Sequence, residues 1–271
     1  MSNEHDETEK IMPDDGLYFG LGVFETIALE NGTPIFFREH LVRMVTSLKR
    51  LGINVKTHEI VTLAKNACQD NANRGSKVLK LVATEKNRLA SVRTNLYSDE
   101  RRTEGFVCEF SKVRRNETSP LVTMKTLNYG DCILLKREAL SHGIDEPIFL
   151  NTKGLISEGA TSNVFALIDG EVVTPPVSCG LLPGVMRDFA IRVTGAKEHP
   201  LLPEELMRAD EVFLTNSLMG AMPVRRIGTQ VFSHGGYTVA QQINEAYREE
   251  VSATCERWNG EEDPWVQLSG R

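Results

Sequence analysis

The sequence lacks most of the short patterns that identify a function directly. Its five cysteines (Cys68, Cys108, Cys132, Cys179 and Cys255) are scattered and odd in number, which predicts reduced thiols in a cytoplasmic protein rather than a disulfide framework. The sequence shows no metal-ligand spacing, no Walker-type glycine loop and no nucleophilic serine elbow. A metal-dependent or nucleotide-hydrolysing enzyme is therefore not expected.

Long apolar runs and a strong charge imbalance are also missing. No run approaches membrane-spanning length, and the polar, acidic segment 1–15 does not resemble a signal peptide. The net charge of -6 over 271 residues predicts no surface for nucleic acid or an anionic membrane. A chain of this length, with 41% hydrophobic residues, is long enough for two globular domains.

Hydrophobic periodicity predicts an α+β (mixed α/β) protein in two halves. In the first half we expect strands at 17–29, 77–83, 91–96 and 105–110, with helices at 38–51 and 60–68. In the second half we expect helices at 133–141, 185–193 and 238–250, with strands at 147–150, 163–168, 171–174 and 212–215. The predicted division is an N-terminal α+β domain (1–110), a linker rich in Ser, Arg, Asn and Pro (111–120) and a C-terminal domain (121–271).

Lys125 is the first candidate for chemistry. Most lysines are solvated surface charges, but this one follows the apolar, strand-like segment 121–124 and precedes Asn128 and Tyr129. Apolar neighbours can desolvate an amine, which lowers its pKa and frees the neutral form for imine formation. Lys125 is therefore a candidate nucleophile.

Two later segments would complement such a lysine. Glu158 precedes a small-residue bend and an apolar strand, so it is either an ordinary turn residue or a carboxylate that meets a pyridine nitrogen. The N–H groups of Val185 and Met186 follow Pro183 and Gly184 at a helix start, where they would face an anion. A lysine, a buried acid and a helix start are the parts needed to hold pyridoxal phosphate.

Other polar residues are ambiguous from the pattern alone. Ser217 lies in a Thr-Asn-Ser loop that suits either a phosphate or a simple turn. Arg43 lies off the apolar stripe of its helix, which predicts a solvated side chain, whereas His40 is nearer the stripe and is expected to pack or cap.

The order and spacing of these segments resemble the class IV, fold-type IV pyridoxal-phosphate enzymes. The resemblance runs from about residue 16 to about residue 247 and rests on segments 18–26, 40–43, 125–129, 158–165, 174–176 and 182–187. It implies a fold of two domains, the C-terminal one holding pyridoxal 5'-phosphate, in a homodimer with the active site between the domains and near the subunit interface.

The same resemblance assigns roles to individual residues. Lys125 would form the imine with the cofactor and move the proton at the reacting carbon, and Glu158 would pair with the pyridine nitrogen. Tyr129 would reach the ring hydroxyl. Arg43 would bind the phosphate, against the periodicity, together with Val185, Met186 and Ser217.

Within the family the sequence is most like the 4-amino-4-deoxychorismate lyases. Segment 215–224 and the pair of arginines before the lysine, Arg114 and Arg115, resemble lyases, and Met186 stands where aminotransferases usually have Thr. Leu21 replaces a common acid, and segment 84–89 lacks the glycine-rich loop of many relatives, so the substrate-carboxylate contacts are left unassigned.

Three functions follow, in order of preference. The first is a lyase that converts 4-amino-4-deoxychorismate to p-aminobenzoate and pyruvate for folate synthesis. The second is a branched-chain or D-amino-acid aminotransferase, which segment 155–159 and the Trp-containing tail also fit. The third is a binding or scaffold protein that has lost the cofactor.

Overall fold

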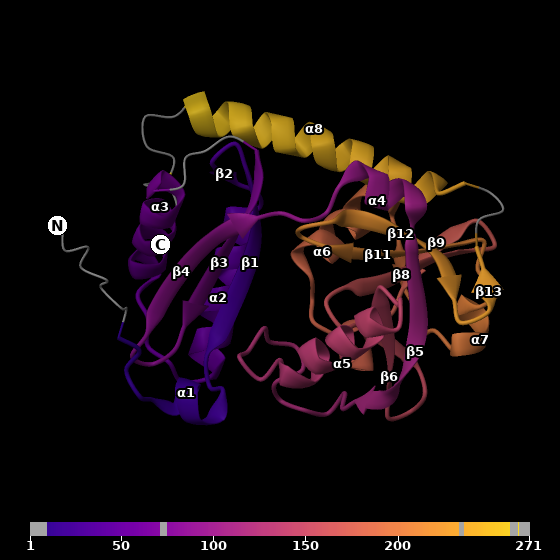
Figure 1. Cartoon of the computed structure of the whole chain (residues 1–271), viewed down its shortest axis with the longest axis horizontal. Helices are drawn as coiled ribbons and strands as arrows, with labels where there is room; N and C mark the ends of the chain where they lie inside the picture. Colours follow the sequence, from indigo (N-terminus) through magenta and orange to yellow (C-terminus); the bar gives the residue numbers. More distant parts are fainter. Residues whose placement is uncertain (1–9, 71–74, 233–235, 261–264, 266–271) are drawn as a thin grey trace.

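Two separate β-sheets form the framework of the protein. The computed structural model describes residues 10–70, 75–232, 236–260 and 265. A four-stranded sheet belongs to the N-terminal half and a nine-stranded sheet to the C-terminal half, and the two halves lie side by side (Figure 1). Within the described residues, no helix is long and apolar enough to cross a membrane.

The small sheet is antiparallel, with strand order β2-β1-β3-β4. Its strands are β1 (Val23–Glu30), β2 (Thr33–Pro34), β3 (Ser76–Ala83) and β4 (Arg88–Thr94). Helices α2 (Phe37–Arg50) and α3 (Thr57–Asp70) cover one face, where Leu41, Met44 and Leu48 pack against Leu79 and Leu81. The opposite face of β1 and β3 stays free of this core, because side chains alternate along each strand.

The large sheet has the strand order β10-β9-β8-β11-β12-β5-β6-β7, with β13 paired to β12. Its strands in chain order are β5 (Phe106–Arg115), β6 (Glu146–Asn151), β7 (Ile156–Gly159), β8 (Asn163–Ile168), β9 (Glu171–Thr174), β10 (Lys197–Glu198), β11 (Glu211–Asn216), β12 (Gly220–Ile227) and β13 (Gln230–Val231). The short helices around it are α4 (Asp99–Glu104), α5 (Gly130–Ser141), η1 (Val177–Cys179), α6 (Val185–Thr194) and α7 (Pro203–Leu206). Most of β6, β7, β8 and β11 is fully buried, as expected for strands covered on both faces.

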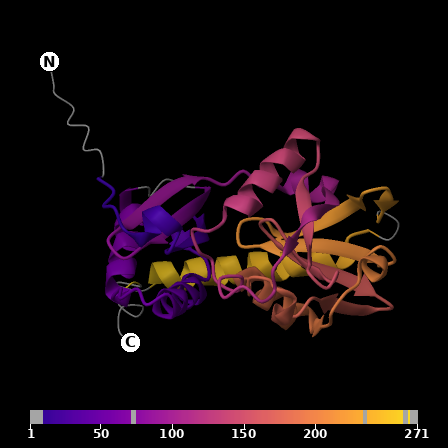
Figure 2. The same cartoon turned by 90° about the horizontal axis from the view of Figure 1, so that it is seen from below.

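The last helix, α8 (Thr238–Gly260), runs along both halves (Figures 1 and 2). Near its start Asn244 exchanges two hydrogen bonds with the backbone of Ala221 on β12, at 2.9 and 2.7 Å. Near its end Trp258 packs on the hydrophobic core beneath the four-stranded sheet, and the Trp265 ring lies edge-on against the rings of Trp258 and Phe37. These two tryptophans therefore pack with the small sheet and its helices.

Most predicted elements are present, and the exceptions have local causes. Segment 15–19 is helix α1 (Asp15–Phe19), capped by the Asp14 side chain, and the strand predicted from Leu17 begins only at Val23. The segment before Lys125, expected to be strand-like, is a turn because Ser119 accepts the backbone N–H of Val122. Helix α8 extends ten residues past the predicted end at 250.

The chain enters the large sheet earlier than the sequence indicated. Residues 111–115 were expected in a linker, but they continue β5, which pairs with β6 at Arg114 and Arg115. The division into an N-terminal domain, a linker and a C-terminal domain stays a prediction. Helix α4 was not predicted, because none of its side chains is buried and it has no apolar stripe.

Candidate active site

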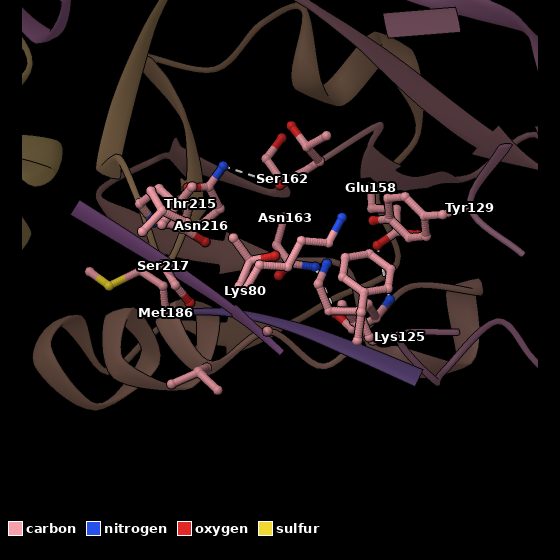
Figure 3. Close-up of a pocket in the computed structure, with 18 of the residues that line it drawn as sticks. Lys80, Lys125, Tyr129, Glu158, Ser162, Asn163, Met186, Thr215, Asn216 and Ser217 are labelled. Carbon is pink, nitrogen blue, oxygen red and sulfur yellow. Dashed lines mark hydrogen bonds between the residues drawn. The ribbon is translucent and has the colours of Figure 1, made fainter. Parts of the chain in front are cut away.

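A cavity of about 420 Å³ lies between the two halves of the chain. Every residue proposed from the sequence lines it: Arg43, Lys125, Tyr129, Glu158, Val185, Met186 and Ser217. Figure 3 shows Lys125, Tyr129 and Glu158 at one end and Ser217 and Met186 at another. The small sheet forms one wall through Phe24, Thr26 and Lys80.

Lys125 is held in place by backbone pairing with the end of β1. The Lys125 carbonyl accepts the N–H of Phe24 at 2.9 Å, and the Leu127 N–H reaches the Gly22 carbonyl at 2.9 Å. These bonds fix the backbone on both sides of the lysine, so its side chain enters the cavity from a rigid position. Its Nζ lies 4.5 Å from the ring centroid of Phe24 and 4.8 Å from that of Tyr129.

The environment of Lys125 favours the neutral amine. Burial, followed by repulsion from Arg43, lowers its pKa to about 8, although Glu25 and Glu158 act in the opposite direction. A neutral amine can attack an aldehyde and can accept a proton, so Lys125 is chemically suited to both tasks. The partial desolvation predicted from the sequence is present.

Glu158 is buried and held from two sides. One oxygen accepts from Arg115 Nε at 3.1 Å and Nη2 at 2.5 Å, and the other accepts the Leu182 N–H at 2.9 Å. Burial raises the pKa of Glu158, and the charge of Arg115 opposes that shift. The carboxylate is therefore fixed in orientation at the wall of the cavity, where it can meet a cationic ring N–H.

Arg43 is not the solvated arginine that helical periodicity predicted. Its guanidinium donates to both oxygens of Glu25, at 2.8 and 2.6 Å, and to the Pro183 carbonyl at 3.0 Å. The same carboxylate is 2.7 Å from His40 Nδ1, and His40 Nε2 lies 3.2 Å from Ser217 Oγ. Glu25 therefore holds Arg43 directly and holds Ser217 through His40. His40 is buried in this network, and it is the packed histidine predicted from the sequence.

Helix α6 begins at the cavity without a side-chain cap. Gly184 is its N-cap residue and provides no side-chain acceptor for the N–H groups of the first turn, and Gly184, Val185 and Met186 all line the cavity. Beside them Thr215 Oγ1 is buried without a hydrogen-bond partner among the described residues. An orphaned hydroxyl next to a helix start and an arginine fits a phosphate group.

Two residues of this site were missed as functional candidates. Arg115 was noted only as part of a lyase-like segment, and Glu25 only within a segment of the resemblance. The signal for Glu25 is an acid at a position of β1 where both flanking segments are apolar. The pairing of Arg115 with Glu158 spans 43 positions, so no local pattern carries it.

Comparison with known proteins identifies the family to which this chain belongs. The model of the family described as Amino-transferase class IV matches residues 22–227. The branched-chain-amino-acid aminotransferase of Escherichia coli is 28% identical over 261 residues, which cover 85% of this chain and 84% of that protein.

Solved structures of other proteins have the same fold as this chain. The branched-chain aminotransferase from Thermoproteus uzoniensis, solved with norvaline, superposes with a TM-score of 0.81 at 26% identity and covers 93% of both chains. A Legionella pneumophila protein named "Putative 4-amino-4-deoxychorismate lyase" has a TM-score of 0.77 at 24% identity and covers 90% of this chain and 97% of that one, a likeness of fold.

The fold and the lysine site define a pyridoxal-phosphate enzyme. Since the family model covers most of the sequence, the chain belongs to the class IV aminotransferase family. Its members use pyridoxal 5'-phosphate, so the predicted cofactor and the α+β fold are confirmed. This result favours an enzyme over the cofactor-free scaffold considered from the sequence.

Proposed function

We propose that the protein is a lyase that converts 4-amino-4-deoxychorismate to p-aminobenzoate and pyruvate. The observation that carries the proposal is that two lyase-like features of the sequence meet at one corner of the cavity. Met186, on α6, and Ser217, in the loop after β11, line it together. The Met186 side chain is buried in the core with Phe189 and Phe213, so hydroxyl contacts to a phosphate would come from Thr215 and Ser217 instead.

Different residues of the cavity would bind different parts of the cofactor. We propose that Arg43, Ser217 and the N–H groups of Val185 and Met186 bind the phosphate, that Glu158 meets the ring nitrogen, and that Tyr129 lies beside the ring hydroxyl. Bound pyridoxal phosphate supplies an electron sink for the carbon that carries the amine. Glu158, held by Arg115, keeps its charge fixed beside that sink.

Lys125 then acts as the base. Its neutral amine removes the proton from the amine-bearing carbon of the substrate, and the enolpyruvyl C–O bond breaks as the ring becomes aromatic. The enol of pyruvate takes up a proton, so the substrate divides into p-aminobenzoate and pyruvate with no other reactant. Phe24 and Tyr129 cover the lysine and keep water from the reacting carbon.

The test is release of p-aminobenzoate from aminodeoxychorismate generated in place by a partner synthase. We expect release that requires pyridoxal phosphate and falls to background in Lys125→Ala, with Lys56→Ala as a control on an exposed lysine outside the cavity. Substantial turnover by Lys125→Ala, or no release from a protein that holds the cofactor, would overturn the proposal.

The second candidate is an aminotransferase, which the names of the relatives favour. The first proton transfer to Lys125 would be the same, and the proton would return to the cofactor instead of a C–O bond breaking. Conversion of the cofactor to its amine form by leucine, with release of the matching oxo acid, would support it. A D-amino acid in place of leucine tests the D-specific version.

We also propose a homodimer. Helix α1 exposes Leu17, Tyr18 and Phe19, with exposed fractions of 58%, 65% and 66%, and such a patch is typical of a protein interface. Light scattering on the holoenzyme gives the mass, and a monomer would contradict this proposal.

A further inference from the structure

A buried histidine connects the acid of β1 to the corner of the cavity where we place the phosphate. His40, on α2, is 1% exposed. Its Nδ1 lies 2.7 Å from Glu25 Oε2, and its Nε2 lies 3.2 Å from Ser217 Oγ. Glu25 is itself buried, whereas Ser217 lines the cavity beside Thr215 and Met186 (Figure 3). A ligand that contacts Ser217 is therefore one hydrogen bond away from His40.

The contact with Glu25 determines which ring nitrogen of His40 always carries a proton. Although burial acts to raise the pKa of Glu25, Arg43 and His40 hold it at about 2, so the carboxylate is ionised at neutral pH. An ionised carboxylate only accepts hydrogen bonds, so Nδ1 of His40 is the donor. Nε2 then reports the charge of the ring, because it accepts when His40 is neutral and donates when His40 is an imidazolium.

The surroundings of His40 favour the neutral ring. Burial lowers the pKa of His40, the charge of Glu25 on β1 acts in the opposite direction, and the charges of Arg43 on α2 and of Lys125 add to the lowering. Nε2 of a neutral ring can only accept, so the Ser217 hydroxyl donates to it. A hydroxyl has a single proton, and Ser217 therefore presents only lone pairs to the cavity, which repel an anion.

We propose that His40 takes up a proton when a dianionic phosphate binds at the corner formed by Arg43, Ser217 and the start of α6. This inference rests on the phosphate site of the proposed function and not on the reaction. The proton comes from solvent and adds to Nε2, which then donates to Ser217 Oγ, and the hydroxyl proton turns to a phosphate oxygen. The imidazolium is stabilised by two anions, the Glu25 carboxylate and the phosphate.

The alternative arrangement is less favourable. If Ser217 turned its proton to the phosphate while His40 stayed neutral, the buried Nε2 would lose its donor, and an unsatisfied buried acceptor costs free energy. His40 is therefore a positioning residue, which acts through Ser217 by setting the direction of the hydrogen bond that the hydroxyl makes. Lys125 is the other group able to take up a proton, because burial lowers its pKa to about 8.

The experiment uses 4'-deoxypyridoxine 5'-phosphate, which has the ring and phosphate of the cofactor but no aldehyde, so it forms no imine with Lys125. Calorimetry on the full chain freed of cofactor, in buffers of different ionisation enthalpy, gives the protons taken up per ligand bound. The range runs from about pH 7, where a phosphate monoester is mainly dianionic, to about pH 9. We expect the wild type to take up as much as about one proton more than His40→Asn, in which the amide keeps the contact with Glu25 but does not reach Ser217.

The sign of the pH dependence follows from the same linkage. Binding raises the pKa of His40, so the affinity of the wild type should fall as pH rises toward that raised pKa, by up to about tenfold per pH unit beyond the fall in His40→Asn. His58→Asn, a change at an exposed histidine outside the cavity, should behave like the wild type. Lys125→Met should keep the extra proton, because the proton is held by His40.

Nitrogen NMR of the histidine rings gives a readout that needs no variant, since the His40 signals can be assigned by through-bond correlation to the backbone. We expect one protonated ring nitrogen before the ligand is added and two in the complex.

Each remaining outcome decides against one of the proposals. Equal proton uptake by the wild type and His40→Asn, or a single protonated nitrogen in the complex, would overturn the role of His40. Uptake that is lost in Lys125→Met and kept in His40→Asn would assign the proton to the lysine and overturn it as well. No binding of the probe would overturn the phosphate site together with this inference. Proton uptake at His40 without p-aminobenzoate release keeps the inference and rejects the lyase.

Discussion

At the scale of single residues, the surroundings of the Lys125 amine set its reactivity. Burial and the nearby Arg43 charge lower its pKa from the ordinary 10.5 to about 8. Only the neutral amine attacks the aldehyde of the cofactor, so uptake of pyridoxal phosphate by the apoprotein should become faster as pH rises through about 8 and then level off. Rapid-mixing absorbance measures this, and an inflection near 10.5 would contradict it.

A second residue-scale prediction concerns the buried Glu25. Burial acts to raise the pKa of Glu25, but Arg43 and His40 outweigh it and lower the value to about 2. Removing one partner of a buried pair leaves the others uncompensated, so Glu25→Ala should lower the free energy of unfolding by about 3–5 kcal/mol. Urea denaturation at neutral pH measures the loss.

The pH dependence gives the control. A depressed acid contributes stability above its ordinary pKa of 4.5 and loses it as pH falls toward 2, so the gap between wild type and Glu25→Ala should narrow over that range. Glu59→Ala removes a carboxylate that is 42% exposed and 3.6 Å from Arg88, and should cost less than about 1 kcal/mol. Equal losses in the two variants would show that the Glu25 network does not stabilise the fold.

At the scale of an element, the start of α6 depends on the close approach of Gly184 to the Asn163 side chain. A Cβ at Gly184 would lie 2.2 Å from Asn163 Oδ1, although the backbone φ of -76° suits any residue. Gly184→Ala should therefore force Asn163 aside, destabilise the protein by about 1–3 kcal/mol and weaken retention of pyridoxal phosphate. Urea denaturation and cofactor titration measure both effects.

Gly130 provides the matched control. It begins α5, and an added Cβ would meet nothing within 4 Å. Gly130→Ala should be neutral or stabilise the helix by about 0.5–1 kcal/mol. If Gly184→Ala were as stable as Gly130→Ala and kept its cofactor, the close approach of Gly184 to Asn163 would not constrain the start of α6.

Helices were predictable from the sequence where their apolar residues lie on one face. The stripe of Leu41, Met44 and Leu48 predicts α2 because those side chains form the small-domain core. Arg43 was misplaced because its burial depends on Glu25, 18 positions earlier, and a helical wheel contains no such information. Segment 111–115 is polar, so its place in β5 follows from pairing with β6 rather than from its own pattern.

The cofactor-site residues, in contrast, were found through order and spacing along the chain. Lys125, Glu158 and the α6 start converge on one cavity, as the resemblance implied. The convergence depends on contacts between distant segments: the N–H of Phe24 on β1 donates to the Lys125 carbonyl, and the N–H of Leu182, just before α6, donates to Glu158. No window of sequence contains both partners of such a contact, and composition alone would have left Lys125 as one lysine among many.

At the scale of the whole molecule, α8 connects the two halves. Its start is capped by Glu211, which accepts the N–H groups of Val239 and Ala240 at 3.0 and 2.9 Å, while Trp258 near its end packs on the core of the small sheet. Trp258 is partly buried, so Trp258→Ala should lower the free energy of unfolding by less than the roughly 3–5 kcal/mol of a fully buried tryptophan, and it should separate unfolding into two transitions.

Scanning calorimetry tests this coupling. The wild type is expected to unfold in one transition because the helix links the halves, and Glu249→Ala, an exposed change on the same helix, should leave that transition in place. A single transition at an unchanged temperature in Trp258→Ala would show that the two halves are coupled through other contacts.

The two walls of the cavity come from different sheets, and that arrangement has an evolutionary consequence. Most residues proposed to hold the cofactor come from the large sheet and its helices, with Arg43 on α2 as the exception, whereas Thr26, Lys80 and Arg93 stand on the small sheet. Mutations on the small sheet can therefore change substrate specificity while Lys125 and Glu158 stay unchanged. Related enzymes can then evolve different reactions through substitutions on this one sheet, and chimaeras that exchange the small sheet and its helices between relatives would test this.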